Sequence, residues 1–422
     1  MNPFMKTLKK IAAAYNGVSL ILRIAIGLVV GVILALVCPG ATWLKELGNL
    51  FVGALKGIAP VLVFVIVASA LAQGSSKLDR RFGTVMWLYM LTTFVAAALS
   101  VVTSMLFPQM LLLPEAAEAE VIPQGLGEVM HTLLSNIVSN PISAIMNGNY
   151  IGILMWGCLF GVAMKKLGAD STKVFLSNTA DAVSTIVRWI INLAPFGIMG
   201  LVFTNVVSNG LAIFTQYGKL LLLLVGTMLF MALVINPIII FIYLRCNPYP
   251  LVFRCLRESG LTAFFTRSSA ANIPVNMAMC EKIGLDKDFY SVSIPLGATI
   301  NMDGAAITIT IMTLAAANTL GMQVSLPAAI LLSIMSALGA CGASGVAGGS
   351  LLLIPMACSL FGISNDIAMQ VVGVGFIIGV IQDSVETALN SAGDVEFAAT
   401  AEYHQWLKQG KPLPEFLGGK KK

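Results

Sequence analysis

The sequence predicts an all-α polytopic membrane protein, in which eight transmembrane helices combine with two opposed re-entrant helical hairpins that form inverted repeats. Three observations lead to this prediction. Hydrophobic residues make up 57% of the chain and charged residues only 11%, which is typical of a chain that crosses a bilayer several times. Basic residues alternate from loop to loop. Two further apolar regions are broken by polar, glycine-rich stretches into arms too short to span a membrane.

A membrane-crossing helix needs about 20 predominantly apolar residues, and eight segments of the chain meet this requirement. The seventh contains a polar interruption. The predicted spans are residues 20–37, 47–72, 84–113, 142–164, 183–207, 218–244, 289–318 and 367–390.

The distribution of basic residues predicts the orientation of these spans. Lysine and arginine gather in the tail before the first span, in the loops after the second, fourth and sixth spans, and in the tail after the last span. The loop 114–140 contains glutamates but neither lysine nor arginine. Because basic loops mark the cytoplasmic side, we expect both termini to be cytoplasmic. Residues 1–19 show no signal-peptide cleavage pattern, so they are interpreted as a cytoplasmic tail.

The two broken apolar regions lie at about 251–281 and 327–361. Each turns at a tip rich in serine, glycine or asparagine, at residues 265–274 and 342–350. The loop charges place the first hairpin on the cytoplasmic side and the second on the outer side. Each hairpin precedes a span that carries a mid-membrane asparagine and aspartate, so the pattern repeats with inverted topology. Transporters bind their substrate at such a repeat interface, near the membrane midplane.

The polar interruption of the seventh span is the sequence Asn301-Met302-Asp303-Gly304. An ionisable residue at mid-membrane depth is a functional-site hypothesis, because each unpaired polar group in hydrocarbon costs several kcal/mol. The alternative is a polar kink packed inside the protein. In the eighth span, Asp383, Thr387, Asn390 and Asp394 share one helical face; Asp394 could also be an interfacial carboxylate near the helix end.

These residue types suit the binding of a cation and a carboxylate. Asn301, Asn390 and Asp394 offer the oxygen ligands that a hard monovalent cation requires. The hairpin tips offer free N–H groups at helix ends, which attract carboxylates, and Ser268 and Ser269 add hydroxyl donors. The seven cysteines are irregularly spaced and the two histidines lie outside the apolar core, so we expect no transition-metal site and no enzyme nucleophile.

The motifs at 266–269 (Thr-Arg-Ser-Ser) and 295–304 (Pro-Leu-Gly-Ala-Thr-Ile-Asn-Met-Asp-Gly), with the glycine-rich second hairpin, closely resemble the dicarboxylate/amino acid:cation symporter family, the glutamate-transporter group. The resemblance covers most of the chain and is strongest over 261–394. Within this family the chain is most similar to the bacterial sodium-coupled serine/threonine symporters. The resemblance implies a homotrimer in the bacterial inner membrane, sodium as the coupling ion, no organic cofactor, and no nucleic-acid partner.

The resemblance also implies the residues that bind the substrate. Ser269 and the backbone of the second hairpin would hold the substrate carboxylate with help from Asn390, and Asp383 would take the ammonium group beside Thr387. The implied substrate-binding residues are Ser269, Val346, Ala347, Gly348, Asp383, Glu386, Thr387 and Asn390.

Three sodium sites follow from the same resemblance. The first lies between Gly297, Asn301, Asn390 and Asp394, and the second near Thr299 and Ser344. The third uses Tyr89, Thr92, Thr93, Asn301 and Asp303.

The chain departs from the acidic-substrate members of the family in its eighth span. Those members carry an arginine where this chain has Glu386, and an aspartate where it has Gly379. Ala305 replaces their side-chain threonine. Because a carboxylate at Glu386 would repel an acidic substrate, we expect a small neutral amino acid. Arg267 is expected to balance the charge of Asp383, Glu386 or both.

The resemblance divides the chain into four parts. Residues 1–19 and 397–422 form the tails, and residues 251–396 the transport core. Residues 20–250 form helices one to six, of which one, two, four and five are the scaffold while three and six accompany the transport unit. The expected function is sodium-coupled symport of L-serine and L-threonine by an elevator-type alternating-access mechanism. The alternatives are proton coupling, another neutral amino acid, or acidic amino acids and dicarboxylates; a membrane-embedded enzyme and an anion channel rank below these.

Overall fold

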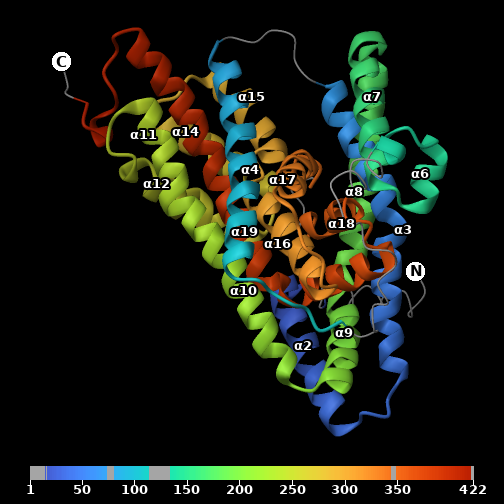
Figure 1. Ribbon diagram of the computed structural model, residues 1–422. Helices are drawn as coiled ribbons and strands as arrows, with labels where there is room; N and C mark the ends of the chain where they lie inside the picture. Colours follow the sequence, from blue (N-terminus) through green and yellow to red (C-terminus); the bar gives the residue numbers. More distant parts are fainter. Residues whose placement is uncertain (1–14, 16, 74–79, 114–133, 344–347, 420–422) are drawn as a thin grey trace, which may run out of the picture.

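The computed structural model describes residues 15, 17–73, 80–113, 134–343 and 348–419. Over these residues all regular structure is helical, which confirms the predicted all-α class (Figure 1). Six helices are long and apolar enough to cross a membrane. A seventh span arises if α8 (Asp170–Asn192) and α9 (Ala194–Asn209), which meet at a bend of 54°, count as one. The first predicted span forms α2 (Leu20–Val37).

The first group of helices packs around α3 (Trp43–Ala72). This helix contacts α7 (Tyr150–Leu167), α8 and α9, and α9 in turn packs along α2. Gly27 and Gly31 permit this last contact, because an added Cβ would lie 2.2 Å and 2.6 Å from backbone oxygens of α9. Close approach at small residues is the usual way in which membrane helices pack.

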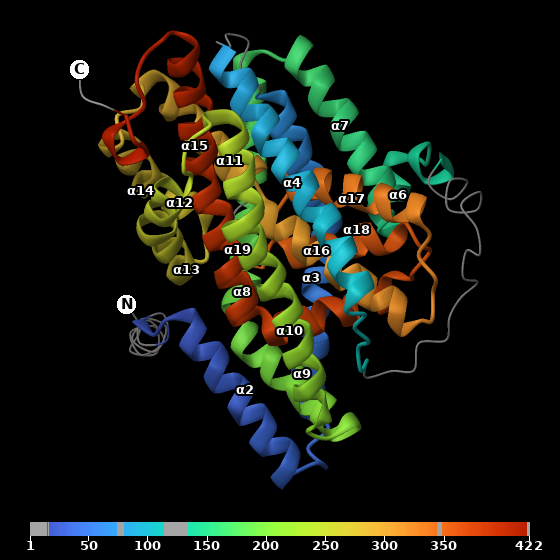
Figure 2. The ribbon, with the colours of Figure 1, turned by 60° about the vertical axis from the view of Figure 1, so that its left-hand side comes forward.

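The second group surrounds α16 (Asp303–Thr319) and α19 (Asn365–Lys408). The helix α16 contacts α4 (Arg80–Leu106), α17 (Leu326–Ala340) and α19, and it is buried through its apolar stretch. The views in Figures 1 and 2 show α16 and α19 running through the middle of this group. The sixth predicted span is continuous but has three parts: α10 (Ala212–Phe230), a π-helical stretch Met231–Ile235 and α11 (Asn236–Leu244). Both α10 and α11 contact α19.

The helix breaks occur where the polar motifs predicted them. The seventh span divides into α15 (Lys287–Ile300) and α16, with Asn301 and Met302 outside both helices. The region predicted as the first hairpin contains α12 (Tyr249–Cys255), a π-helical stretch Leu256–Gly260 and α13 (Leu261–Thr266), followed by a turn and α14 (Ser269–Lys282). The region predicted as the second hairpin contains α17, the 3₁₀ turn Ser350–Leu353 and α18 (Ile354–Ser359).

The helices differ from the predicted spans in four places. The fifth predicted span, 183–207, begins inside α8 and crosses the bend between α8 and α9. The third span ends at Leu106 rather than 113, because Pro108 cannot continue a helix and restricts the residue before it. The fourth span is split between α6 (Pro141–Asn147) and α7 at Gly148, whose φ of 65° favours glycine. The helix that contains the eighth predicted span, α19, continues beyond residue 390 to Lys408.

Candidate functional site

The candidate site lies where the helix breaks meet the polar face of α19. This helix contacts α13 and α14 on both sides of the first hairpin's turn, α15 and α16 on both sides of the seventh span's break, and the 3₁₀ turn after the second hairpin's tip. The side chains Asp383, Thr387, Asn390 and Asp394 are all buried along this face, as their spacing predicts.

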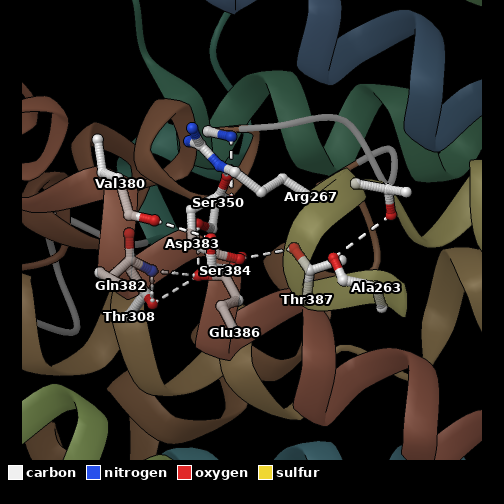
Figure 3. A network of polar contacts seen from close by, with 12 residues as sticks. Ala263, Arg267, Thr308, Ser350, Val380, Gln382, Asp383, Ser384, Glu386 and Thr387 are labelled. Carbon is white, nitrogen blue, oxygen red and sulfur yellow. Dashed lines mark hydrogen bonds and ion pairs between the residues drawn. The ribbon is translucent and has the colours of Figure 1, made fainter. Parts of the chain in front are cut away.

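Arg267 at the turn of the first hairpin pairs with Asp383. Its Nε lies 2.6 Å from Asp383 Oδ2, and both side chains are buried (Figure 3). The turn holds Arg267 at φ 52°, a left-handed conformation that few non-glycine residues adopt. The N–H of Gly348 donates to Asp383 Oδ1 at 3.2 Å. The structure therefore answers the open question about Arg267: its ion-pair partner within the described residues is Asp383.

Glu386 lies one turn further along α19 in a different environment. Its Oε2 accepts hydrogen bonds from Thr308 Oγ1 at 2.6 Å, from Ser350 Oγ at 2.9 Å and from Gln382 Nε2 (Figure 3). These three donors are neutral, and within the described part of the chain Glu386 forms no ion pair. Sequence reasoning missed all three donors. The four-residue spacing from Gln382 to Glu386 was a usable signal, whereas Thr308 reads equally well as a helix-packing hydroxyl.

The four residues of the first predicted cation site come together. Asn301 Nδ2 donates to Asn390 O and to Asp394 Oδ1, each at 3.1 Å, and Asn390 Oδ1 accepts from Gly304 N at 2.7 Å. A Cβ on Gly297 would lie 2.7 Å from Asp394 Oδ1. Only glycine leaves this space between the helix backbone and the carboxylate.

The oxygens that meet here are Asp394 Oδ1 and the backbone carbonyl of Asn390, and carbonyl and carboxylate oxygens are the ligand type that sodium sites use. Asn276, which sequence reasoning missed, lies beside this site and donates from Nδ2 to Asp394 Oδ2 at 3.5 Å.

The third predicted cation site is also assembled. Thr93 Oγ1 lies 3.2 Å from Asp303 Oδ1, and Thr92 Oγ1 lies 3.4 Å from Asn301 Oδ1. The Tyr89 hydroxyl donates to Asp394 O at 3.0 Å. This hydroxyl cluster on α4 therefore meets the broken helix, and Thr92 and Thr93 also lie within hydrogen-bond distance of Tyr89 O in their own helix.

The remaining predicted residues are placed less completely. Ser269 is buried at the start of α14, and Thr387 Oγ1 donates to Asp383 O at 2.7 Å. Thr299 is exposed and donates to Leu296 O. Ser344, Val346 and Ala347 lie outside the described residues.

Comparison with known proteins places this site in a family context. The sequence model of the sodium:dicarboxylate symporter family matches residues 20–403. The chain is 73% identical to a serine/threonine transporter, SstT, of Bifidobacterium adolescentis, over 100% of this chain and 98% of that protein. It is 59% identical to SstT of Streptococcus agalactiae serotype III, over 94% and 98% of the two chains. It is 56% identical to SstT of Streptococcus thermophilus, over 95% and 100%.

Proposed function

This chain belongs to the sodium:dicarboxylate symporter family, and from that premise we propose that it takes up L-serine and L-threonine with sodium by an elevator-type mechanism. The family consists of symporters, so the expectation of a transporter rather than an enzyme is confirmed. The protein is an integral membrane protein with a small-molecule substrate. The proposal retains eight spans, two re-entrant hairpins, the fourfold division of the chain, cytoplasmic termini, the bacterial inner membrane and a homotrimer.

The observation that carries the choice of substrate is the environment of Glu386. Its carboxylate meets hydroxyl and amide donors instead of a cation. An acidic side chain bound beside it at about 4 Å would be repelled by roughly 4 kcal/mol at an effective dielectric constant near 20. That energy corresponds to about a thousandfold in affinity. A hydroxyl side chain avoids this repulsion and can donate to the same carboxylate. The relatives named as serine/threonine transporters support this choice.

The amino acid's charged ends would be held by the hairpin turns and α19. A carboxylate can accept about four hydrogen bonds, and Asp383 uses two acceptor positions for Arg267 and Gly348. The substrate ammonium would take a remaining position on Asp383. Ser269, the N–H groups at the start of α14, the second hairpin's backbone and Asn390 would receive the substrate carboxylate.

Sodium, when bound, supplies the positive charge that balances the buried Asp394 and Asp303. The residues that would hold it are Gly297, Asn301, Asn390 and Asp394 at one site and the Tyr89 cluster with Asp303 at another. Asn390 faces the substrate region as well and is linked to Asn301 by a hydrogen bond. Ion and substrate would thus stabilise the same arrangement of Asn390, which gives a reciprocal coupling of their affinities.

A counterflow experiment in proteoliposomes tests this proposal. Vesicles preloaded with unlabelled serine should accumulate labelled serine or threonine only when sodium is present, and aspartate and glutamate should not compete. Accumulation driven by a proton gradient without sodium would contradict the choice of ion. Strong competition by aspartate would contradict the choice of substrate, and solute flux without exchange would indicate a channel.

A further inference from the structure

A buried polar network joins α14, the helix that follows the turn of the first hairpin, to α19. Asn272 and Asn276 on α14 meet Ser391 on α19 and Ser259 in the π-helical stretch Leu256–Gly260. All four side chains are 0% exposed. Hydrogen bonds are stronger in such an interior than in water, so this network is a firm connection between the two helices.

Ser391 is the centre of this network. Its Oγ accepts hydrogen bonds from Asn272 Nδ2 at 2.7 Å and from Asn276 Nδ2 at 3.1 Å, and its carbonyl oxygen lies 3.1 Å from Asn276 Nδ2. Asn272 Nδ2 also lies 3.2 Å from Asn276 Oδ1 and 3.1 Å from Ser259 Oγ. Pro274 lies between the two asparagines, so contacts on both sides of the proline hold α14 to α19.

Asn276 extends the network to the first predicted cation site. Its Nδ2 donates to Asp394 Oδ2 at 3.5 Å, while Asn301 Nδ2 donates to Asp394 Oδ1 at 3.1 Å. The carboxylate is therefore held through one oxygen by α14 and through the other by the break of the seventh span. Partners that orient a ligand of a metal ion contribute about 10–100-fold to the affinity for the ion.

The same helix begins at the proposed site for the substrate carboxylate. Ser269 is the first residue of α14, and its side chain is buried. Steps of three and four residues lead from Ser269 to Asn272 and on to Asn276, so the three side chains share one face of the helix. This buried face runs from a residue proposed to receive the amino acid to the carboxylate proposed to bind sodium.

We propose that α14 couples the two ligands, and that Asn272 and Asn276 are the positioning residues that tie it to α19 and Asp394. This inference rests on the substrate and sodium sites proposed above. Sodium held by Asp394 and an amino acid held at Ser269 favour the same seating of α14 against α19, so each ligand raises the affinity for the other. This path is separate from the one through Asn390, because it runs through α14 instead of the break of the seventh span.

Equilibrium binding to the purified full-length transporter tests this coupling without transport. Sodium is titrated by calorimetry and by the rise of the unfolding temperature, with and without saturating serine, while choline chloride holds the ionic strength constant. The ratio of the two sodium dissociation constants is the coupling factor, which is typically about 5–150 for two linked sites.

The two asparagines should differ in their effects on these titrations. Asn276→Ala should weaken sodium binding without serine by about tenfold and lower the coupling factor toward one, because it removes the contacts to both Ser391 and Asp394. Asn272→Ala leaves the contact to Asp394 in place. It should also lower the coupling factor, but it should weaken sodium binding without serine less than Asn276→Ala does.

Asn205→Ala is the matched control, because it removes a buried asparagine of α9 that contacts Leu201 O and the Tyr217 hydroxyl instead of the network. It should leave both sodium titrations unchanged. A loss of coupling in Asn205→Ala as large as in the two network variants would show a general effect of removing a buried amide, and would overturn the proposal.

If Asn276→Ala fails to fold, Ser391→Ala takes its place, because it removes the hydroxyl that both asparagines contact; it should lower the coupling factor too. A wild-type coupling factor in folded Asn272 and Asn276 variants would overturn the proposal, even if sodium drives serine uptake by the wild type. A wild-type protein that responds equally to sodium and choline, or whose sodium affinity is unchanged by serine, would instead overturn the sodium coupling itself.

Discussion

Two carboxylates one helical turn apart have opposite surroundings. Asp383 is neutralised by Arg267, whereas Glu386 is held by the neutral donors Thr308, Ser350 and Gln382. The difference follows from what each faces: Asp383 meets the turn of the first hairpin, and Glu386 meets α16 and the start of the 3₁₀ turn. Each residue can therefore be tested separately.

Asp383→Asn should abolish serine uptake, because the proposed ammonium ligand loses its charge. It should also lower the unfolding temperature, since leaving Arg267 buried without its anion costs about 3–5 kcal/mol. The double variant Arg267→Met/Asp383→Asn should recover much of the stability but not the uptake. Thermal unfolding and uptake in proteoliposomes measure the two effects, and near-wild-type uptake by Asp383→Asn would rule out the assignment.

Glu386→Arg should disrupt serine transport, because it places a cation among donors that now satisfy a carboxylate. Combined with Gly379→Asp, it should admit aspartate as a substrate. The carboxylate introduced at position 379 would pair with the arginine introduced at position 386. Position 379 has room for the change: no atom lies within 4 Å of a Cβ built there. Gly379→Asp alone is the control and should not admit aspartate. Competition assays with labelled serine measure the change, and strong aspartate competition against the wild type would contradict the role of Glu386.

At the level of the helices, the polar interruptions of the chain determine where the site forms. The sequence predicts breaks within 265–274 and 301–304 because polar residues stand inside otherwise apolar segments, and the helices break there at 267–268 and 301–302. It does not predict the length of α19, because the polar residues beyond 390 resemble the end of a span although they are buried. Partners such as Asn276 and Thr308 come from distant segments. Their role depends on packing between helices, which periodicity within one segment does not reveal.

The cradle at Gly297 gives a test of the break between α15 and α16. Gly297→Ala places a Cβ 2.7 Å from Asp394 Oδ1 and 2.9 Å from the Tyr89 hydroxyl. It should raise the sodium concentration needed for half-maximal serine uptake by about tenfold, while the pattern of competing amino acids stays the same. Gly379→Ala, the same change in an open helical position, should have little effect. An unchanged sodium dependence in Gly297→Ala would contradict the site.

On the scale of the whole molecule, polar contacts between the described residues connect the two groups of helices. One is the ion pair between Lys56 of α3 and Asp366 at the start of α19. An elevator mechanism requires α3 and α19 to slide past one another, which would separate this pair. The ion pair between Arg81 and Asp286, 3.5 Å apart, lies within the group around α16 and would stay together. The two pairs therefore distinguish movement between the groups from movement within one group.

Cross-linking tests this distinction. Lys56→Cys/Asp366→Cys, joined by a short bifunctional thiol reagent, should lose most serine uptake, and a cleavable reagent should allow recovery after reduction. Arg81→Cys/Asp286→Cys, joined in the same way, should retain uptake. The native cysteines are replaced by serine or alanine in both proteins. Full uptake by the cross-linked Lys56/Asp366 pair would exclude sliding of α3 against α19.

The unbroken course of α19 has a kinematic consequence. Asp383 and Asp394 are eleven residues apart on this helix, about 16 Å along its axis, and the segment between them contains no proline at which it could kink. Any displacement of the carboxylate proposed to carry the amino acid is therefore also a displacement of the carboxylate proposed to carry the ion. The amino acid and the ion would then move together with this one helix. Movement of ions without solute would then have to come from movement of the hairpins, because α19 has no break between Asp383 and Asp394.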